Sequence, residues 1–274
     1  MLNELVQQEC NLNYAFKSWR EEFPEIFYVE ETIGDKSKCA MVLVSLGSFN
    51  MGTLYKYSNA TNSAYSPHKV TLTKDFWMGT YAVTQTLWES VMGSNPSHFK
   101  GANRPVENVS WFDVVEFCNN LSNHEGLEPA YTINGKNVTC NWSAKGYRLP
   151  TEAEWEYSAR ANQDFVYAGS DDVNDIAWHD GNSGKKTHPV GQKSPNAFGL
   201  YDMSGNIREW VWDRFGDYTS GSHTDPTGPD SGPSRVSRGG DWSNDARFSR
   251  VSFRFYYDPT YRSSGLGFRL VRTL

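Results

Sequence analysis

The chain has 274 residues, a formal net charge of −6 and a pI near 5.6, which allows one irregular domain or two small ones with a sizeable core. The acidic balance argues against nucleic acid or an anionic lipid surface as a non-specific partner. No apolar run approaches the roughly 20 residues of a membrane-spanning helix, and Met1–Asn11 lacks the apolar stretch of a signal peptide. A leader removed upstream would leave no trace in this chain.

Residues suited to metal or redox chemistry are sparse. Four cysteines, Cys10, Cys39, Cys118 and Cys140, are too few for a disulfide framework in a chain of this length, and no cysteine follows Cys140. The six histidines lack the His-x-x-x-His spacing, and the cysteines the Cys-x-x-Cys spacing, of local zinc or iron sites. We therefore expect no catalytic metal held by a local motif.

The N-terminal part predicts a helix followed by strands. Apolar residues recur on one helical face of the first 22 residues, at Leu5, Leu12, Phe16 and Trp19. We expect segment 1–39 to be helical and packed on a main domain of residues 40–274. Alternation and glycine punctuation predict strands within 40–52 and 68–81.

Three helices with clear start signals follow. Thr84 precedes a short apolar stripe that ends at Gly93. Ser110 and Thr151 are each followed three residues later by an acidic residue, the spacing of a capping box. Cys118 falls on the apolar face of the second helix, where a small core residue is expected.

Beyond residue 160 helical signals nearly cease. Residues 164–206 and 213–234 are rich in Gly, Asp, Asn, Ser and Pro, and loops this long in a compact domain are usually functional or held by ions. Short helices, small strands and abundant ordered loop together predict an α+β domain.

The last forty residues contain the most unusual stretch. Strand-like pieces at 234–238 and 267–271 flank a segment without helical or strand periodicity. It carries six Phe and Tyr residues among Ser, Asn and Asp, namely Phe248, Phe253, Phe255, Tyr256, Tyr257 and Tyr261. Such a mixture is typical of binding loops. No Lys, Glu, Gln or Met occurs from 235 to 274, an absence that chance and strand composition also explain.

Three long motifs resemble the formylglycine-generating enzyme (sulfatase-modifying factor) family. They are Tyr-Arg-Leu-Pro-Thr-Glu-Ala-Glu-Trp-Glu-Tyr at 147–157, Gly-Leu-Tyr-Asp-Met-Ser-Gly-Asn-Ile-Arg-Glu-Trp at 199–210 and Arg-Val-Ser-Arg-Gly-Gly-Asp-Trp at 235–242. The resemblance covers roughly residues 40–274. It implies a C-type-lectin-like fold of the sulfatase-modifying subtype.

The family's oxidase activity is the obvious alternative function. The resemblance implies a cysteine pair in the C-terminal loop region that binds copper(I), a soft ion suited to thiolates. That region of this chain holds no cysteine. We therefore expect no enzyme activity, no catalytic residues and no catalytic cofactor.

The C-terminal segment also resembles the variable proteins of diversity-generating retroelements, known from Treponema. In that family adenine-directed mutation of Asn codons never yields Lys, Glu, Gln or Met, which would explain their absence. The resemblance assigns a fixed framework of Arg238, Gly239, Gly240, Trp242, Arg247, Arg250, Arg254, Pro259, Arg262, Gly267, Phe268 and Arg269. It assigns as variable, within a region of about 238–268, Asp241, Ser243, Asn244, Asp245, Phe248, Phe253, Phe255, Tyr256, Tyr257, Thr260, Tyr261, Ser263, Ser264 and Leu266. Ser249 and Ser252 fit either class.

The function that this resemblance implies is ligand binding. We expect the variable positions to form one solvent-facing patch that binds a protein or glycan ligand, on a monomer at the cell surface or outside the cell. The framework arginines are expected to bind loop carbonyls and carboxylates, with solvated surface charge as the alternative. A carbohydrate-binding lectin is the runner-up, although neither the Glu-Pro-Asn nor the Gln-Pro-Asp tripeptide of calcium-dependent sugar recognition occurs.

A structural calcium ion is a separate expectation. The Gly-Asn-x-x-Glu-Trp turn resembles a family calcium site, which would use Asn206, Ile207 and Glu209. The alternative is a turn whose Asn caps the chain locally. One Asn and one Glu alone cannot fill a shell of six or more oxygen ligands.

Overall fold

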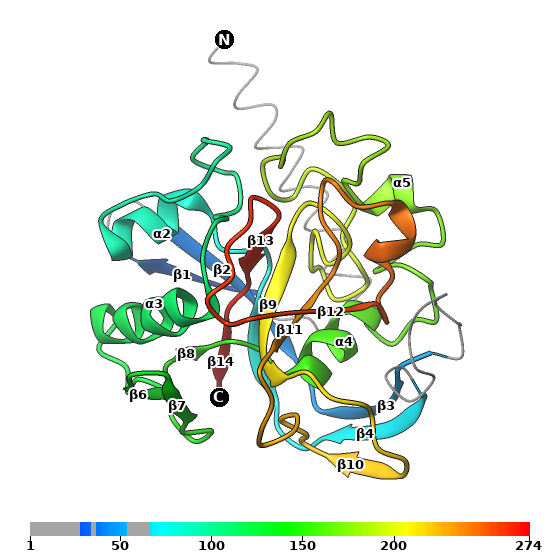
Figure 1. The fold of residues 1–274 in the computed structure, drawn as a ribbon, viewed down its shortest axis with the longest axis horizontal. Helices are drawn as coiled ribbons and strands as arrows, with labels where there is room; N and C mark the ends of the chain where they lie inside the picture. Colours follow the sequence, from blue (N-terminus) through cyan, green and yellow to red (C-terminus); the bar gives the residue numbers. More distant parts are fainter. Residues whose placement is uncertain (1–27, 34–36, 54–65) are drawn as a thin grey trace.

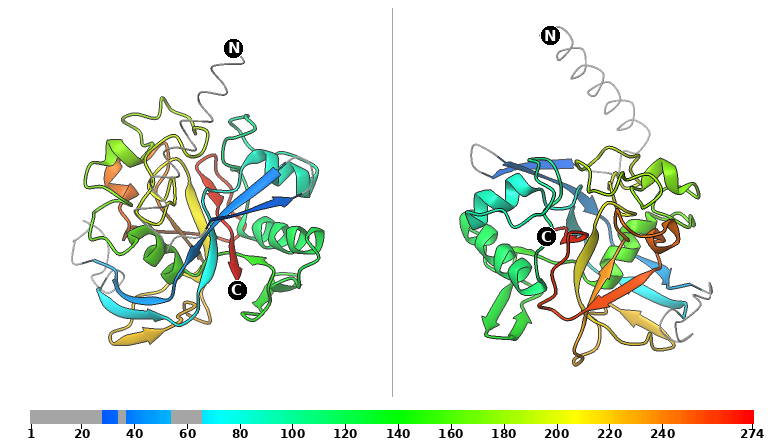
Figure 2. Two further views of the ribbon diagram at one scale, coloured as in Figure 1. Left: turned by 180° about the vertical axis from the view of Figure 1, so that it is seen from behind. Right: turned by 45° about the horizontal axis from the view of Figure 1, so that its top comes forward.

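The computed structural model describes residues 28–33, 37–53 and 66–274 (Figures 1 and 2). The predicted helix within residues 1–22, and its packing on the main domain, lie outside the described residues and stay predictions. The described part of segment 1–39 forms strand rather than helix, and the expected boundary at residue 40 falls inside a strand.

The largest sheet brings together the first and the last of the described strands. Its five strands run in the order β1 (Tyr28–Ile33), β2 (Ser37–Val44), β5 (Phe76–Gly79), β14 (Val271–Thr273) and β8 (Tyr147–Arg148). All neighbouring pairs are antiparallel. The C-terminal strand therefore lies inside the sheet, between strands that come from much earlier in the chain.

A second sheet carries the C-terminal segment. Its order is β12 (Arg254–Tyr257), β11 (Arg235–Arg238), β9 (Arg208–Arg214) and β13 (Leu266–Phe268). Strand β9 lies at the centre of the molecule, with the red β13 beside it (Figure 1). The stretch 267–271, predicted as one strand, is divided between β13 in this sheet and β14 in the other, and the buried Arg269 lies between them.

Two smaller sheets complete the strand arrangement. One contains β3 (Gly47–Met51), β4 (His68–Leu72) and β10 (Ser222–Thr224), with β10 parallel to β4. The other is a hairpin of β6 (Tyr131–Asn134) and β7 (Asn137–Cys140).

The three helices expected after Thr84, Ser110 and Thr151 are confirmed, with their start signals. They are α2 (Gln85–Met92), α3 (Trp111–His124) and α4 (Glu152–Arg160). The Thr84 hydroxyl accepts the Leu87 N–H before α2, and complete capping boxes begin α3 and α4. Two shorter helices follow, α5 (Val173–Ile176) and the 3-10 turn η3 (Ala246–Ser249). None of the described helices is long and apolar enough to cross a membrane.

The core has two parts, and the C-terminal strands contribute to both. Under α2 and α3, Trp88 stacks on Phe117 and both contact Phe268 of β13. Under α4, Trp155 packs in a cluster that includes Val271 of β14. Cys118 is fully buried in the first part, as expected.

Candidate ligand-binding face

The predicted variable segment is the excursion of the chain between β11 and β13. It begins with Gly239 and Gly240, both with left-handed φ, at +96° and +72°. A side chain at Gly240 would lie 2.7 Å from the Ser249 hydroxyl, so the turn requires glycine. The chain then forms η3, returns as edge strand β12 and reaches β13 through a loop.

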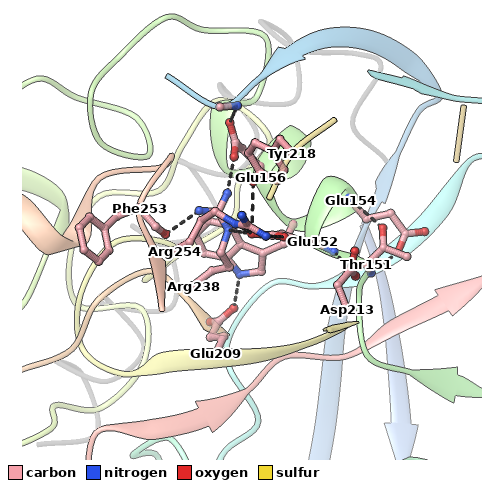
Figure 3. A network of polar contacts seen from close by, with 12 residues as sticks. Thr151, Glu152, Glu154, Glu156, Glu209, Asp213, Tyr218, Arg238, Phe253 and Arg254 are labelled. Atoms are coloured by element: carbon pink, nitrogen blue, oxygen red, sulfur yellow. Dashed lines mark hydrogen bonds and ion pairs between the residues drawn. The ribbon is translucent and has the colours of Figure 1, made fainter. Parts of the chain in front are cut away.

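Buried arginine–glutamate pairs anchor this excursion to α4 (Figure 3). Arg254 donates to both Glu152 oxygens at 2.6 and 2.8 Å. Arg238 donates to Glu156 and, at 2.5 Å, to the backbone carbonyl of Phe253. The arginines and glutamates of these pairs are almost fully buried. The expectation that framework arginines bind carboxylates and loop carbonyls is confirmed here.

The charges in this network are matched. Burial alone would raise the pKa of Glu152, but the Arg254 and Arg238 guanidinium groups hold it below its ordinary value. The Glu152 carboxylate is therefore ionised at neutral pH. Removing one partner of such a pair leaves an uncompensated buried charge, which costs about 3–5 kcal/mol.

The remaining framework arginines differ from one another. Arg269 is fully buried and donates to both Glu209 oxygens and to the carbonyls of Gly79 and Tyr201. Arg262 is half exposed and pairs with Asp113 of α3. Arg247, 61% exposed, fits the alternative of solvated charge.

The fourteen predicted variable residues fall into three classes of exposure. Five are exposed, namely Ser243, Asp245, Tyr256, Thr260 and Tyr261. Six are half-buried, namely Asn244, Phe248, Phe255, Tyr257, Ser263 and Ser264. Three are buried, namely Asp241, Phe253 and Leu266, together with Ser249 and Ser252, the two residues left unassigned.

The expectation that all these positions face solvent is wrong for the buried residues. Asp241 is ion-paired with Arg208, and its Oδ1 accepts the backbone N–H and the hydroxyl of Ser243 at 2.8 and 2.7 Å. Leu266 belongs to the core part under α3 because β13 passes through it. Phe253 is covered by the rings of Phe248 and Phe255, whose centroids lie 4.9 and 4.8 Å away.

Four of the remaining aromatics form a continuous row across one face. Phe248 contacts Phe255 with ring centroids 6.0 Å apart, and Tyr257 stacks on Tyr261 at 4.6 Å. The Arg208 guanidinium joins the two pairs, lying 5.1 Å from the Phe255 ring and 4.9 Å from the Tyr257 ring. We call Phe248, Phe255, Tyr257 and Tyr261 the aromatic row.

Tyr256 does not belong to this row. Successive residues of a strand point to opposite faces, and Tyr256 stacks instead on Phe215 at 4.1 Å, where Arg254 also lies. The predicted single patch is therefore divided by β12. Arg208, which the sequence did not single out, is the polar centre of the row because it binds the Asp241 carboxylate and the Tyr257 hydroxyl.

The residues proposed for calcium do not fit a calcium site in this structure. Both Glu209 oxygens accept hydrogen bonds from Arg269, and one also accepts from the Trp155 indole at 2.7 Å. Oδ1 of Asn206 accepts the His188 N–H at 2.9 Å, and its Nδ2 donates to the His188 carbonyl.

The surroundings of this turn agree with that conclusion. Ile207 is buried, and the described residues contain no cluster of three or more His, Cys, Asp or Glu able to hold a metal ion. Arg269 supplies the positive charge that a metal would bring to Glu209, and Asn206 connects the turn to the segment at His188 through hydrogen bonds.

The described cysteines lie far in the sequence from the C-terminal segment, and two of them are poor thiolates. Burial raises the pKa of Cys118 well above its ordinary value and that of Cys140 to about 12. Cys39 is buried in β2.

Comparison with known proteins agrees with this architecture. The family model of the sulfatase-modifying factor enzyme 1-like domain matches residues 29–274. The chain belongs to this family. Its α+β, C-type-lectin-like fold is the fold that the motifs predicted.

Three known proteins are similar to this chain over different shares of their length. The structure of Treponema denticola variable protein 1 is 37% identical with a TM-score of 0.83, covering 90% of this chain and 99% of that one. Chaperone protein LppX of Paenibacillus barcinonensis is 39% identical over 85% of this chain and 89% of its own. The mouse formylglycine-generating enzyme is 30% identical over 74% of this chain but only 52% of the enzyme.

Proposed function

We propose that this protein is a non-enzymatic binding protein whose C-terminal segment displays a ligand-binding surface centred on the aromatic row. The observation that carries the proposal is the contrast between two sets of neighbouring residues. Arg238 and Arg254 are buried in ion pairs with α4, whereas Tyr261 is 42% exposed and its row neighbours are partly exposed. Because the buried ion pairs hold the segment in place, the side chains on its surface can change without loss of the fold.

The relatives support the same role. Two of the proteins that match along most of both chains are named a variable protein and a chaperone, and neither of these two names is that of an enzyme. The formylglycine-generating enzymes are matched over about half to two-thirds of their length, and the C-terminal segment of this chain lacks cysteine.

A protein is the ligand that we favour. Tyrosine and arginine are the residues that dominate binding energy in protein interfaces, and the row combines tyrosine rings with Arg208. A glycan that stacks on the same rings is the runner-up. By resemblance, we also propose that the protein acts at the cell surface or outside the cell, and as a monomer.

The row can be tested against Tyr256, which provides a matched control on the opposite face of β12. Wild type, Tyr261→Ala and Tyr256→Ala are each immobilised and exposed to extracts of cells and surfaces from the natural habitat. The partners that each protein retains are then compared. We expect Tyr261→Ala to lose a partner that the other two retain, with equal melting temperatures. Identical retention by all three proteins would contradict a role for the row.

Diversification by a retroelement is a further part of the proposal. It is supported by the absence of Lys, Glu, Gln and Met after residue 235. Sequencing this gene in several isolates should reveal substitutions concentrated at the exposed and half-buried positions of the segment. Substitutions spread evenly over the chain would refute diversification but would leave the binding role open.

A further inference from the structure

Outside the aromatic row, a cavity of about 330 Å³ lies where β9, β11, the β6–β7 turn and the start of the 258–265 loop meet. Three cationic side chains line it, namely Lys136, Arg214 and Arg235. One carboxylate, Asp258, lines it as well. An excess of positive charge in one cavity is unexpected in a chain of net charge −6.

The two arginines are direct cross-strand neighbours. Arg235 of β11 pairs with Arg214 of β9 in the antiparallel register, and like charges directly opposite each other destabilise a sheet. Arg235 is only 5% exposed. Its guanidinium lies 3.8 Å from the Trp111 ring and donates to the Trp212 carbonyl.

The like-charge pair has no carboxylate counterion among the described residues. Arg214 donates to the carbonyl of Gly232 at 2.5 Å, and no ion pair joins either arginine to an acidic side chain in the described part of the chain. Asp213 is the acidic side chain that most favours the charge of Arg235. Burial, reinforced by Glu152, raises the Asp213 pKa to about 8, so its carboxyl is mostly neutral at pH 7.

Arg235 itself stays charged. Burial and the neighbouring Arg214 lower its pKa to about 10, which still leaves the guanidinium protonated at pH 7. Asp213 and Tyr131 act on this pKa in the opposite direction, with a smaller effect. The one carboxylate on the cavity wall, Asp258, stays ionised, because hydrogen bonds from Thr260, with a smaller effect of Lys136, lower its pKa. It offsets one of the three cations, which leaves the lining with a net charge of about +2.

We propose that this cavity binds a tetrahedral oxyanion, as a phosphate or sulfate group carried by a small molecule or by a larger ligand. Guanidinium groups bind such anions through paired N–H donors, and an anion between Arg214 and Arg235 would remove their mutual repulsion. Phe112 and two prolines on the wall provide apolar contact for the carbon atoms next to the anion. The site consists mainly of scaffold residues and does not depend on the proposed role of the aromatic row.

The test uses inorganic phosphate and sulfate as probes of the full chain. Melting temperatures are measured at increasing sodium phosphate or sodium sulfate, with sodium chloride at equal ionic strength as the reference. We expect a saturable rise, since an anion that binds the folded state stabilises it by mass action. The arm with the lower apparent Kd identifies which of the two oxyanions is preferred. No rise beyond sodium chloride in either arm would overturn the proposal.

Arg214→Gln is the decisive variant, because Arg235→Gln also removes the contact with Trp111. Loss of Arg214 should raise the apparent Kd for the anion about tenfold or more, which is the effect of losing a hydrogen bond to a charged group. Without phosphate the variant should melt at or above the wild-type temperature, because the like-charge pair is gone. Arg247→Gln, which removes the same charge from a side chain that is 61% exposed, should respond like wild type. An unchanged response of Arg214→Gln, or a uniform loss in both variants, would refute the site.

Discussion

The Asp241 carboxylate lies 2.7 Å from Nε of Arg208, and both side chains are buried. This pair connects the C-terminal segment with β9, and the same guanidinium lies between Phe255 and Tyr257 of the aromatic row. The orientation of the row therefore depends on an aspartate that the sequence alone places among the surface positions. Asp241 is scaffold, whereas Asp245, four residues later, is 54% exposed.

Replacing Asp241 by Asn should destabilise the protein by about 3–5 kcal/mol, because Arg208 would keep a buried charge without its counterion. Asp245→Asn removes the same charge from an exposed side chain and should change the stability by less than about 0.5 kcal/mol. Denaturant unfolding of both variants measures the difference. Equal effects would show that the buried pair does not contribute as inferred.

A comparison of Phe253→Ala with Tyr261→Ala should likewise distinguish a ring that stabilises the fold from a ring on the surface. Its ring is 9% exposed between Phe248 and Phe255, so truncation should cost about 3 kcal/mol. Tyr261→Ala, at a side chain 42% exposed, should cost well under 1 kcal/mol. Thermal melts of the two variants give the comparison, and a Tyr261→Ala protein that unfolds would place that ring in the core and contradict the proposed surface.

The features that the sequence predicts well are local ones. Thr84, Ser110 and Thr151 begin helices because each side chain bonds a backbone N–H within the next three residues. Strand β9 was not predicted. Its sequence Arg-Glu-Trp-Val-Trp-Asp-Arg does not alternate, because its charged residues are buried against partners far along the chain, such as Arg269 for Glu209.

The candidate surface could be predicted only in outline. The unusual mixture of aromatics indicates a binding segment, but adjacent residues such as Tyr256 and Tyr257 face opposite sides once β12 forms. The burial of Leu266 depends on β13 pairing with β9. The oxyanion cavity had no sequence signal, because Arg214 and Arg235 become neighbours only through the register of two strands.

Asp213 should make the stability depend on pH. Burial, with the Glu152 carboxylate next in effect, raises the Asp213 pKa from 3.8 to about 8. Between these values the folded state holds a proton that the unfolded state releases, so this group contributes full stability below pH 4 and loses it as pH rises to about 8.

Asp213→Asn removes this titration while keeping an acceptor for the Glu152 N–H. As pH rises from 5 to 9, we expect the free energy of unfolding of the variant to increase relative to that of wild type. The increase should be at least about 1.4 kcal/mol, the free energy of one pKa unit. Denaturant unfolding across this range measures the gain, with Asp230→Asn, at an exposed position, as the control. A difference independent of pH would show that Asp213 does not hold the proton.

Calcium should not change the thermal stability. The Glu209 carboxylate is already neutralised by Arg269, and Asn206 is bound to the His188 backbone, so no oxygen of these two side chains is left without a donor. Melting curves in a chelator and in added calcium are expected to coincide. A rise with calcium that is lost in Asn206→Ala would restore the family-type metal site.

The last prediction concerns the oxidase activity of the family. A thiol must ionise to bind copper(I) or to react, yet burial raises the pKa of Cys118 and Cys140 far above neutrality, and the segment after Cys140 contains no cysteine. We therefore expect a sulfatase-motif peptide to keep its cysteine when incubated with this protein, copper and a reductant.

Mass spectrometry of the peptide detects the loss of the thiol, with the mouse formylglycine-generating enzyme as the positive control. The second control is a variant of this protein with Cys39, Cys118 and Cys140 replaced by Ser or Ala. Turnover by wild type that exceeds the rate of a protein-free sample would refute the non-enzymatic role. Turnover lost in this triple variant would assign the reaction to one of these three thiols, whereas turnover that persists would require a mechanism that uses none of them.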